Sequence, residues 1–162
     1  CYVESTKTKK GTTAVDAAFL EEISRWRDLL AKNIALRNPR LSTRELNFAV
    51  QRTIDRLIFL RICEDRGIES YAYLQSLLNG ERVYARLLKH FRDADDKYNS
   101  GLFCFSERRR DMTEMSDISD RVPSGFAEPP DRLSLELNID DKPLKDIIGN
   151  LYYPEKPYRT TR

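Results

Sequence analysis

Apolar side chains recur at helical spacing in the first third of the chain. The stretch contains Phe19, Ile23, Trp26, Leu30 and Ile34. Steps of three and four residues place these side chains on one face of a helix. Asp16 can cap the start of this helix. The helix should end at Asn38-Pro39, because the residue before a proline disfavours the helical region.

A second long helix is predicted over about residues 42–66. Ser42-Thr43-Arg44-Glu45 has the pattern of a capping box at its start, and Gly67 can supply the left-handed residue after its end. Helical spacing gives it two apolar sides: Leu46, Val50, Ile54, Leu57 and Ile58 on one, and Phe48, Phe59 and Cys63 nearly opposite. A helix that is apolar on two sides has packing partners on both. We therefore expect it to be the central helix of the fold.

The remaining elements are predicted to be shorter. Helical spacing of apolar residues indicates further helices over 71–78, 83–95 and 140–152. The apolar run 102–105 and the alternating leucines of 133–137 predict short strands or extended segments. The fold class is therefore mainly α, a helical bundle around the helix at 42–66.

The polarity of the chain divides it into four parts. Residues 1–13 are rich in lysine and threonine and are interpreted as a disordered lead-in, followed by the helical bundle over 14–105. Residues 106–131 lose apolar periodicity and are interpreted as a polar surface loop. Residues 132–162 hold the short strand, the last helix and a tail. Because the chain begins with Cys1 rather than methionine, we expect it to be part of a longer reading frame.

Composition excludes several classes of protein. The net charge of +2 does not by itself indicate a nucleic-acid-binding protein, so any such binding depends on local clusters of arginine and lysine. The three cysteines, Cys1, Cys63 and Cys104, have neither zinc-site nor disulfide-framework spacing, which favours a reducing cytoplasm. No apolar run approaches the length of a membrane span, and no signal peptide precedes the first helix.

Catalytic patterns are not found in the sequence. The single histidine, His90, has no nucleophile near it, and a structural role is the better interpretation. The carboxylate pairs Glu64-Asp65 and Asp95-Asp96 fall at predicted helix ends, where solvation or capping is favoured over a metal site. The run Arg108, Arg109 and Arg110 could contact DNA phosphates, although a solvated loop explains it more simply.

Arginines on the helix at 42–66 are the most informative residues. Arg61 shares a side with apolar residues and lies within side-chain reach of Glu64 and Asp65, which predicts structural ion pairs. Arg52 and Arg56 fall near the other apolar side. For these two, structural pairing and contact with DNA or a neighbouring domain remain equal alternatives.

Three local patterns resemble a known family. They are Trp26-Arg27-x-x-Leu30-Ala31, the stretch from Val50-Gln51-Arg52 to Asp65-Arg66-Gly67, and Ile147-Ile148-x-x-Leu151-Tyr152-Tyr153-Pro154 followed by Pro157-Tyr158. Together they resemble the helical region of large single-chain restriction–modification enzymes, type IIG and relatives, which bear an adenine-N6 DNA methyltransferase.

The resemblance implies a connector rather than a catalytic domain. The family's nuclease carboxylates, its S-adenosylmethionine loop and its Asn-Pro-Pro-Tyr motif do not occur in this sequence. The resemblance therefore implies no catalytic, cofactor-binding or metal-binding residue here. It implies that the longer protein uses S-adenosylmethionine, and Mg²⁺ if it cleaves DNA. The implied partners are double-stranded DNA and flanking nuclease and methyltransferase domains.

Three functions remain open from the sequence. The first is a non-catalytic, DNA-proximal connector of a restriction–modification DNA methyltransferase. The second is a stand-alone helical module that binds a protein partner and has no role on DNA. A continuous apolar surface would favour the second, and a stripe of arginine and lysine the first. The third, a small independent enzyme, lacks a convergent set of catalytic side chains.

Overall fold

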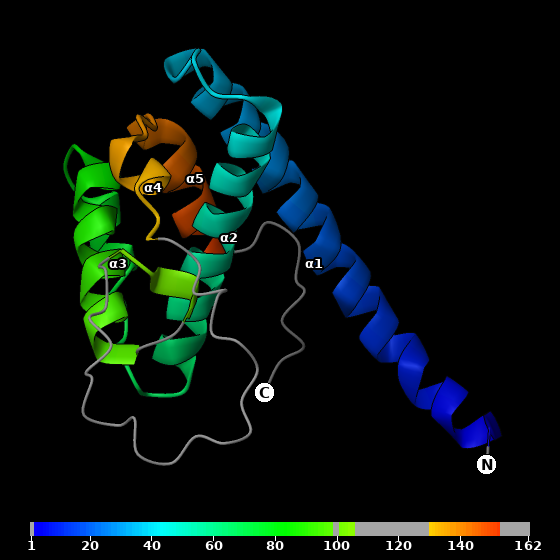
Figure 1. Cartoon of the computed structure of the whole chain (residues 1–162). Helices are drawn as coiled ribbons and strands as arrows, with labels where there is room; N and C mark the ends of the chain where they lie inside the picture. The colour runs from blue at the N-terminus through cyan, green and yellow to red at the C-terminus, as the bar shows by residue number, and fades with distance from the viewer. Residues whose placement is uncertain (1, 99–100, 106–129, 153–162) are drawn as a thin grey trace, which may run out of the picture.

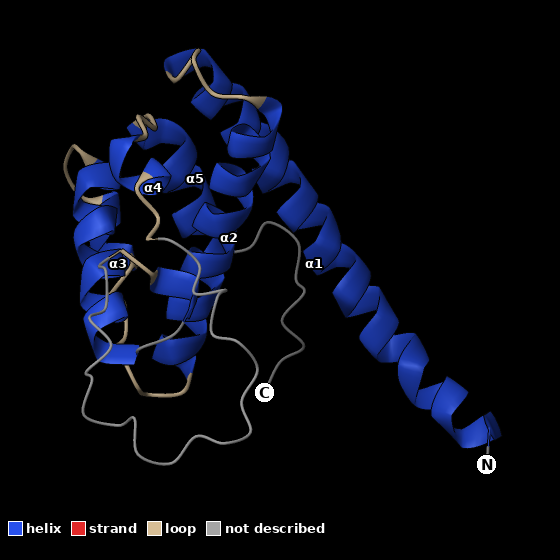
Figure 2. Cartoon of the chain, in the orientation of Figure 1, coloured by secondary structure: helices blue, strands red, loops and turns tan. Residues whose placement is uncertain are grey.

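The computed structural model describes residues 2–98, 101–105 and 130–152, with side chains from Ala17 onward. Its elements in chain order are α1 (Tyr2–Arg37), α2 (Thr43–Asp65), η1 (Gln75–Leu78), α3 (Val83–Tyr98), η2 (Gly101–Phe103), α4 (Leu133–Glu136) and α5 (Asp141–Tyr152). Every described element is helical (Figure 2), which confirms the mainly α fold class. None of these helices is both long and apolar enough to cross a membrane.

Helix α1 is the longest element and begins earlier than predicted. It spans 36 residues from Tyr2, whereas the sequence pattern placed a disordered lead-in at 1–13 and a cap at Asp16. The lead-in has no proline, and its lysines favour helix, so the chain can remain helical upstream of the apolar stripe. The C-terminal half of α1 packs beside α2, and the N-terminal half projects beyond the bundle (Figure 1). The buried stripe is Trp26, Leu30 and Ile34.

Helix α2 begins at the predicted capping box. The Ser42 backbone N–H donates to Glu45 Oε2 at 2.8 Å, and the Glu45 N–H donates to Ser42 Oγ at 3.2 Å. Gly67 follows the end of α2 with a φ of 71°, a left-handed conformation that suits glycine. The 23 residues of α2 contact α1, η2, α4 and α5.

The segments 102–105 and 133–137, predicted as short strands or extended segments, do not form strands in the described structure. Residues 101–103 form the 3₁₀ turn η2, and residues 133–136 form the single helical turn α4. The Asp131 carboxylate accepts a hydrogen bond from the Ser134 N–H at 2.9 Å, which favours a helical turn there. No strand in the described part of the chain lies beside either segment, and a strand without a partner leaves its backbone groups unpaired.

The predicted helix at 71–78 is only partly helical. Residues 71–74 form turns, and the 3₁₀ helix η1 covers Gln75–Leu78. Ala72 has a φ of 66°, a conformation incompatible with a continuous right-handed helix. Residues 106–129 and 153–162, predicted as most of the polar loop and as the tail, lie outside the described residues.

A single hydrophobic core joins all the helices. Its largest fully buried apolar members are Trp26, Phe91, Phe103, Leu30, Ile34, Ile54, Leu57, Leu60, Leu74, Leu77 and Leu87. Arg56, only 1% exposed, is buried among them. A charged group is rarely buried unless it is paired, so its surroundings are the natural place to look for a site.

Candidate functional site

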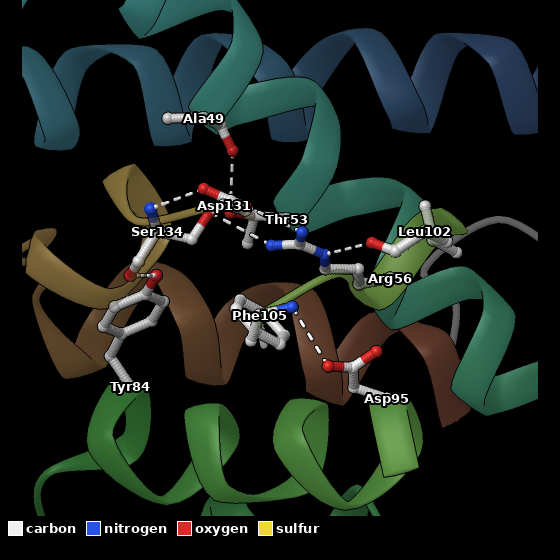
Figure 3. Close-up of polar contacts among 9 residues, drawn as sticks. All are labelled: Ala49, Thr53, Arg56, Tyr84, Asp95, Leu102, Phe105, Asp131 and Ser134. Atoms are coloured by element: carbon white, nitrogen blue, oxygen red, sulfur yellow. Dashed lines mark hydrogen bonds and ion pairs between the residues drawn. The ribbon is translucent and has the colours of Figure 1, made fainter. Parts of the chain in front are cut away.

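The Arg56 guanidinium bridges three parts of the chain. Its Nη2 donates to Asp131 Oδ2 at 2.7 Å, its Nη1 to Ser134 Oγ at 3.0 Å, and its Nε to the Leu102 carbonyl at 2.8 Å. These three acceptors converge on it from outside α2 (Figure 3). We call Arg56, Asp131, Ser134 and Tyr84 the Arg56 cluster.

Further hydrogen bonds of the Arg56 cluster connect segments that are distant in sequence. Asp131 Oδ2 also accepts from Ser134 Oγ at 2.5 Å, and Tyr84 OH donates to the Ser134 carbonyl. The Asp131 N–H donates to the Cys104 carbonyl at 2.7 Å. Residues 102–104 and 131–134 are therefore fixed beside each other and to α2.

Aromatic rings complete the environment of Arg56. The guanidinium carbon lies 4.6 Å from the ring centroid of Phe105, 5.6 Å from Phe91 and 6.0 Å from Phe103. Burial lowers the pKa of Arg56, and the Asp131 carboxylate opposes that effect. Burial also raises the pKa of Tyr84. A cation surrounded by rings and hydrogen bonded through each of its three nitrogens is held as a structural element.

A second polar cluster lies at the C-terminal end of α2. Tyr152 OH is 2.6 Å from both carboxylate oxygens of Glu64, and Glu64 Oε1 also accepts from the Leu74 N–H at 2.8 Å. The Gln75 N–H donates to Tyr152 OH at 3.1 Å. Burial, together with the Glu64 hydrogen bond, raises the pKa of Tyr152. We call these residues, with Arg61, the Glu64 cluster.

Arg61 pairs with both carboxylates that its spacing indicates. Its Nη1 lies 3.6 Å from Glu64 Oε2 and closer to Asp65 Oδ1. Its guanidinium carbon lies 4.5 Å from the ring centroid of Tyr152. The interpretation of Glu64 as a solvated or capping charge is wrong, because Glu64 is buried and ties α2 to η1 and α5.

The arginines predicted to contact DNA or a neighbouring domain lie in different environments. Arg56 cannot contact DNA in this fold, because its guanidinium is inside the bundle. Arg52 is half-buried, with its guanidinium carbon 5.2 Å from the ring centroid of Phe48. Arg108, Arg109 and Arg110 lie outside the described residues.

Sequence reasoning identified the carboxylate partners of Arg61 but not those partners of the two clusters that are distant in sequence. Asp131 and Ser134 are distant in sequence from Arg56, Tyr152 is distant from Glu64, and Tyr84 is distant from the Ser134 carbonyl to which it donates. The available sequence clue was an apolar helix side interrupted by arginine, which requires a buried carboxylate somewhere. The clue could not say which of the 26 acidic residues supplies it.

Metal ligands do not cluster in the part of the chain that the structure describes. No group of three or more histidine, cysteine or acidic side chains is arranged there to hold a metal ion. Cys63 is a buried free thiol whose pKa is raised by burial, and Cys104 is a free, half-buried thiol. Cys1 lies outside the described residues.

His90 is half-buried and stacks on Tyr73. The ring centroids are 4.1 Å apart, with an interplanar angle of 25°. Its Nε2 is buried and makes no hydrogen bond within the described structure. Burial lowers the pKa of His90 below 6.5; Lys89 and Arg86 act in the same direction, while Asp93 and Glu69 oppose it. His90 is therefore neutral in the folded chain over a wider pH range than in the unfolded chain.

The free energy of unfolding should fall when the pH drops below about 6.5, the usual pKa of histidine. Below that pH, His90 is protonated in the unfolded chain but stays neutral in the folded chain. The free energy of unfolding therefore falls with pH until the lower folded pKa of His90 is reached. Urea unfolding between pH 7.5 and 5 measures this loss, and His90→Gln should make the curve flatter. Because His90 is the only histidine, its NMR titration is unambiguous, and a pKa at or above 6.5 would contradict the prediction.

The chain is similar to part of a restriction–modification enzyme. It is 40% identical over 139 residues to the type II restriction enzyme and methyltransferase RM.Eco57I of Escherichia coli, a match that covers 86% of this chain. The chain spans only 13% of the length of that relative. No family model and no solved structure matches the chain. The resemblance to restriction–modification enzymes is thereby confirmed.

Proposed function

We propose that the chain is a non-catalytic helical module of a cytoplasmic restriction–modification DNA methyltransferase. The observation that carries the proposal is the 40% identity over 86% of the chain to a restriction enzyme and methyltransferase. In this proposal the longer protein methylates adenine at N6 with S-adenosylmethionine, and uses Mg²⁺ where it also cleaves DNA. This module connects its nuclease and methyltransferase domains.

The two polar clusters support a connector role. Each ties α2 to other parts of the chain: the Arg56 cluster to 102–104 and 131–134, and the Glu64 cluster to the start of η1 and to α5. Buried ion pairs of this kind fix packing geometry more than they add stability. A connector needs such fixed geometry, because it sets the distance and orientation between the domains on either side.

In this proposal, exposed cations contact the DNA phosphates, and Arg56 does not. Arg40 and Arg44 are exposed beside the start of α2, and neither forms an ion pair within the described part of the chain. The nearby Glu45 carboxylate is occupied by the capping box. The first turn of a helix also carries a partial positive charge, which favours a phosphate there.

The isolated chain should bind duplex DNA weakly and without turnover. We expect a Kd on the order of 10⁻⁴–10⁻⁶ M that weakens steeply with salt, as for other sequence-independent phosphate contacts. Fluorescence anisotropy with a labelled duplex over a salt series measures this. The double variant Arg40→Gln/Arg44→Gln should reduce the slope of log K against log salt by about 1.8, from about 0.9 per lost contact.

Controls separate the parts of this proposal. Arg66→Gln/Arg92→Gln removes two exposed arginines at other positions and should leave the salt slope unchanged. No binding at low salt would remove DNA contact from the role of this module. Methyl transfer from labelled S-adenosylmethionine, or Mg²⁺-dependent cleavage, by the purified chain would disprove the non-catalytic role.

Exposed apolar side chains favour a second candidate function, a module that binds a protein partner. Leu36 is 72% exposed, Ile68 52% and Tyr71 73%. Large apolar side chains at such exposure are typical of surfaces that other proteins cover when they gather in one patch. Leu36 lies on α1, and Ile68 and Tyr71 lie in the segment between α2 and η1.

A further inference from the structure

An open groove of about 710 Å³ lies between the start of α3 and residues 135–141. Its apolar lining comes from Ala85 and Leu88 of α3 and from Leu135, Leu137 and Ile139. Glu81 and Arg82, both exposed, line its polar rim. The volume is within the range of ligand-binding clefts, about 300–1,000 Å³. The groove is separate from the Arg56 and Glu64 clusters, apart from Tyr84, which also lines it.

One edge of the segment 137–140 is hydrogen bonded to α1 and the turn that follows it. The Asn38 side chain accepts from the Asn138 N–H at 2.9 Å and donates to the Asn138 carbonyl at 2.8 Å. Two residues later, the Asp140 N–H donates to Asn33 Oδ1 at 2.9 Å. Bonds made by every second residue toward one side are the pattern of an extended strand. Leu137 itself has extended dihedral angles, φ −68° and ψ 145°.

The opposite edge of this segment has unused backbone groups. The Ile139 N–H and carbonyl and the Leu137 carbonyl make no hydrogen bond among the described residues. In an extended segment these groups point away from those of Asn138 and Asp140. They therefore point away from α1, and Leu137 and Ile139 themselves line the groove. One residue in an antiparallel partner could exchange both bonds with Ile139.

Both walls of the groove are held in place. The Asp141 carboxylate accepts from the Val83 N–H at 2.9 Å and from the Arg82 N–H at 3.1 Å, which links the start of α3 to α5. Arg82 is held at a φ of 54°, which is strained for a residue with a side chain. On the other wall, Asp140 Oδ2 accepts from Arg37 and Asn33. A partner would meet a preformed surface and would lose little free energy in ordering it.

We propose that this groove binds an extended peptide segment of a separate protein by strand addition. The backbone of the peptide would pair with Ile139 and the Leu137 carbonyl, which is the recognition mode of proteins that extend a sheet edge. Side chains alternate along a strand, so apolar residues at every second position of the peptide would contact Ala85, Leu88 and Leu135.

The position of the groove favours a separate protein as the partner. Figure 1 shows the starts of α3 and α5 at one end of the bundle, with α5 running away from that end toward Tyr152 and the start of α1 projecting beyond the bundle, also away from that end. The helix ends at Tyr2 and Tyr152 therefore lie away from the groove. A partner from another chain can approach this end directly. The inference does not depend on the proposed role in DNA methylation.

Selection from a random library of twelve-residue peptides on the whole chain tests the proposal. Peptides that also bind the variant Ala85→Trp, in which an indole fills the groove, are removed by counter-selection. Enriched peptides should carry apolar residues at alternate positions. Their affinity, measured by fluorescence anisotropy, should fall at least tenfold for Ala85→Trp. The control Ala35→Trp places an indole on an exposed alanine of α1, outside the lining of the groove, and should bind as the unmodified chain does.

Hydrogen exchange in the unmodified chain tests the backbone pairing without any variant. The Ile139 amide should exchange rapidly in the free chain and at least tenfold more slowly when the selected peptide is saturating. No enriched sequence, or equal affinity for Ala85→Trp with its helical content retained, would overturn the groove as the binding site. Binding that leaves the Ile139 amide unprotected would overturn strand addition.

Discussion

Replacement of Asp131 by alanine should lower the free energy of unfolding by about 3–5 kcal/mol, the usual cost of leaving a buried charge without its partner. The change removes the carboxylate that accepts from Arg56, Ser134 Oγ and the Ser134 N–H. The Arg56 guanidinium remains surrounded by Phe91, Phe103 and Phe105, where water cannot solvate it. Urea unfolding followed by circular dichroism measures the loss.

The double variant Arg56→Met/Asp131→Leu separates the cost of an unpaired charge from the cost of lost packing. Apolar replacement of a buried pair is often neutral or stabilising, so this variant should recover most of the loss seen with Asp131→Ala. Asp96→Ala alters an exposed carboxylate of α3 and should change stability by no more than about 0.5 kcal/mol. A loss below about 1 kcal/mol for Asp131→Ala would show that Arg56 is not held as the structure describes.

Replacement of Glu64 by alanine is expected to have the second largest effect, a loss of about 3 kcal/mol, because several buried donors lose their acceptor together. The Leu74 N–H and Tyr152 OH would have no carboxylate to donate to, and the partly exposed Asp65 would be the remaining carboxylate partner of Arg61 in the described structure. The contacts between α2, η1 and α5 should therefore loosen first. Hydrogen exchange of the Leu74 and Gln75 amides, measured beside urea unfolding, would locate the change.

Two variants with smaller expected losses of stability separate the contributions of the partners of Glu64 and Arg61. Tyr152→Phe removes one hydroxyl and retains the ring beside Arg61, so it should cost about 1–2 kcal/mol. Asp65→Ala removes a carboxylate that is 53% exposed, and such surface pairs contribute about 0–1 kcal/mol. If Asp65→Ala proved as damaging as Glu64→Ala, the assignment of Glu64 as the anchor of this cluster would be wrong.

Tertiary contacts overruled the local sequence pattern in two places. Leu133, Leu135 and Leu137 alternate as in a strand, yet the Asp131 carboxylate accepts from the Ser134 N–H in a helical turn, and Arg56 binds that turn from α2. Residues 102–105 form a 3₁₀ turn and its exit, because the Leu102 carbonyl accepts from Arg56 and the Phe105 N–H donates to Asp95. Alternation predicts a strand only where a partner strand is available.

The sequence by itself determined the features that depend on neighbouring residues. Apolar residues at steps of three and four located the buried stripe of α1, and the Ser42–Glu45 capping box located the start of α2. The spacing of Arg61, Glu64 and Asp65 placed their side chains within reach of one another. Local patterns also carried the resemblance to restriction–modification enzymes, because such a resemblance depends only on the order of the residues.

Only the tertiary structure decided the role of Arg56 and the existence of the groove. Arg56 and Asp131 are 75 residues apart, and Asn38 and Asn138 are 100 residues apart. Nothing in a local pattern states which distant carboxylate will meet an arginine, since that depends on how the helices pack. For the same reason, the sequence left Arg56 open as a DNA contact, and the fold placed it inside the bundle.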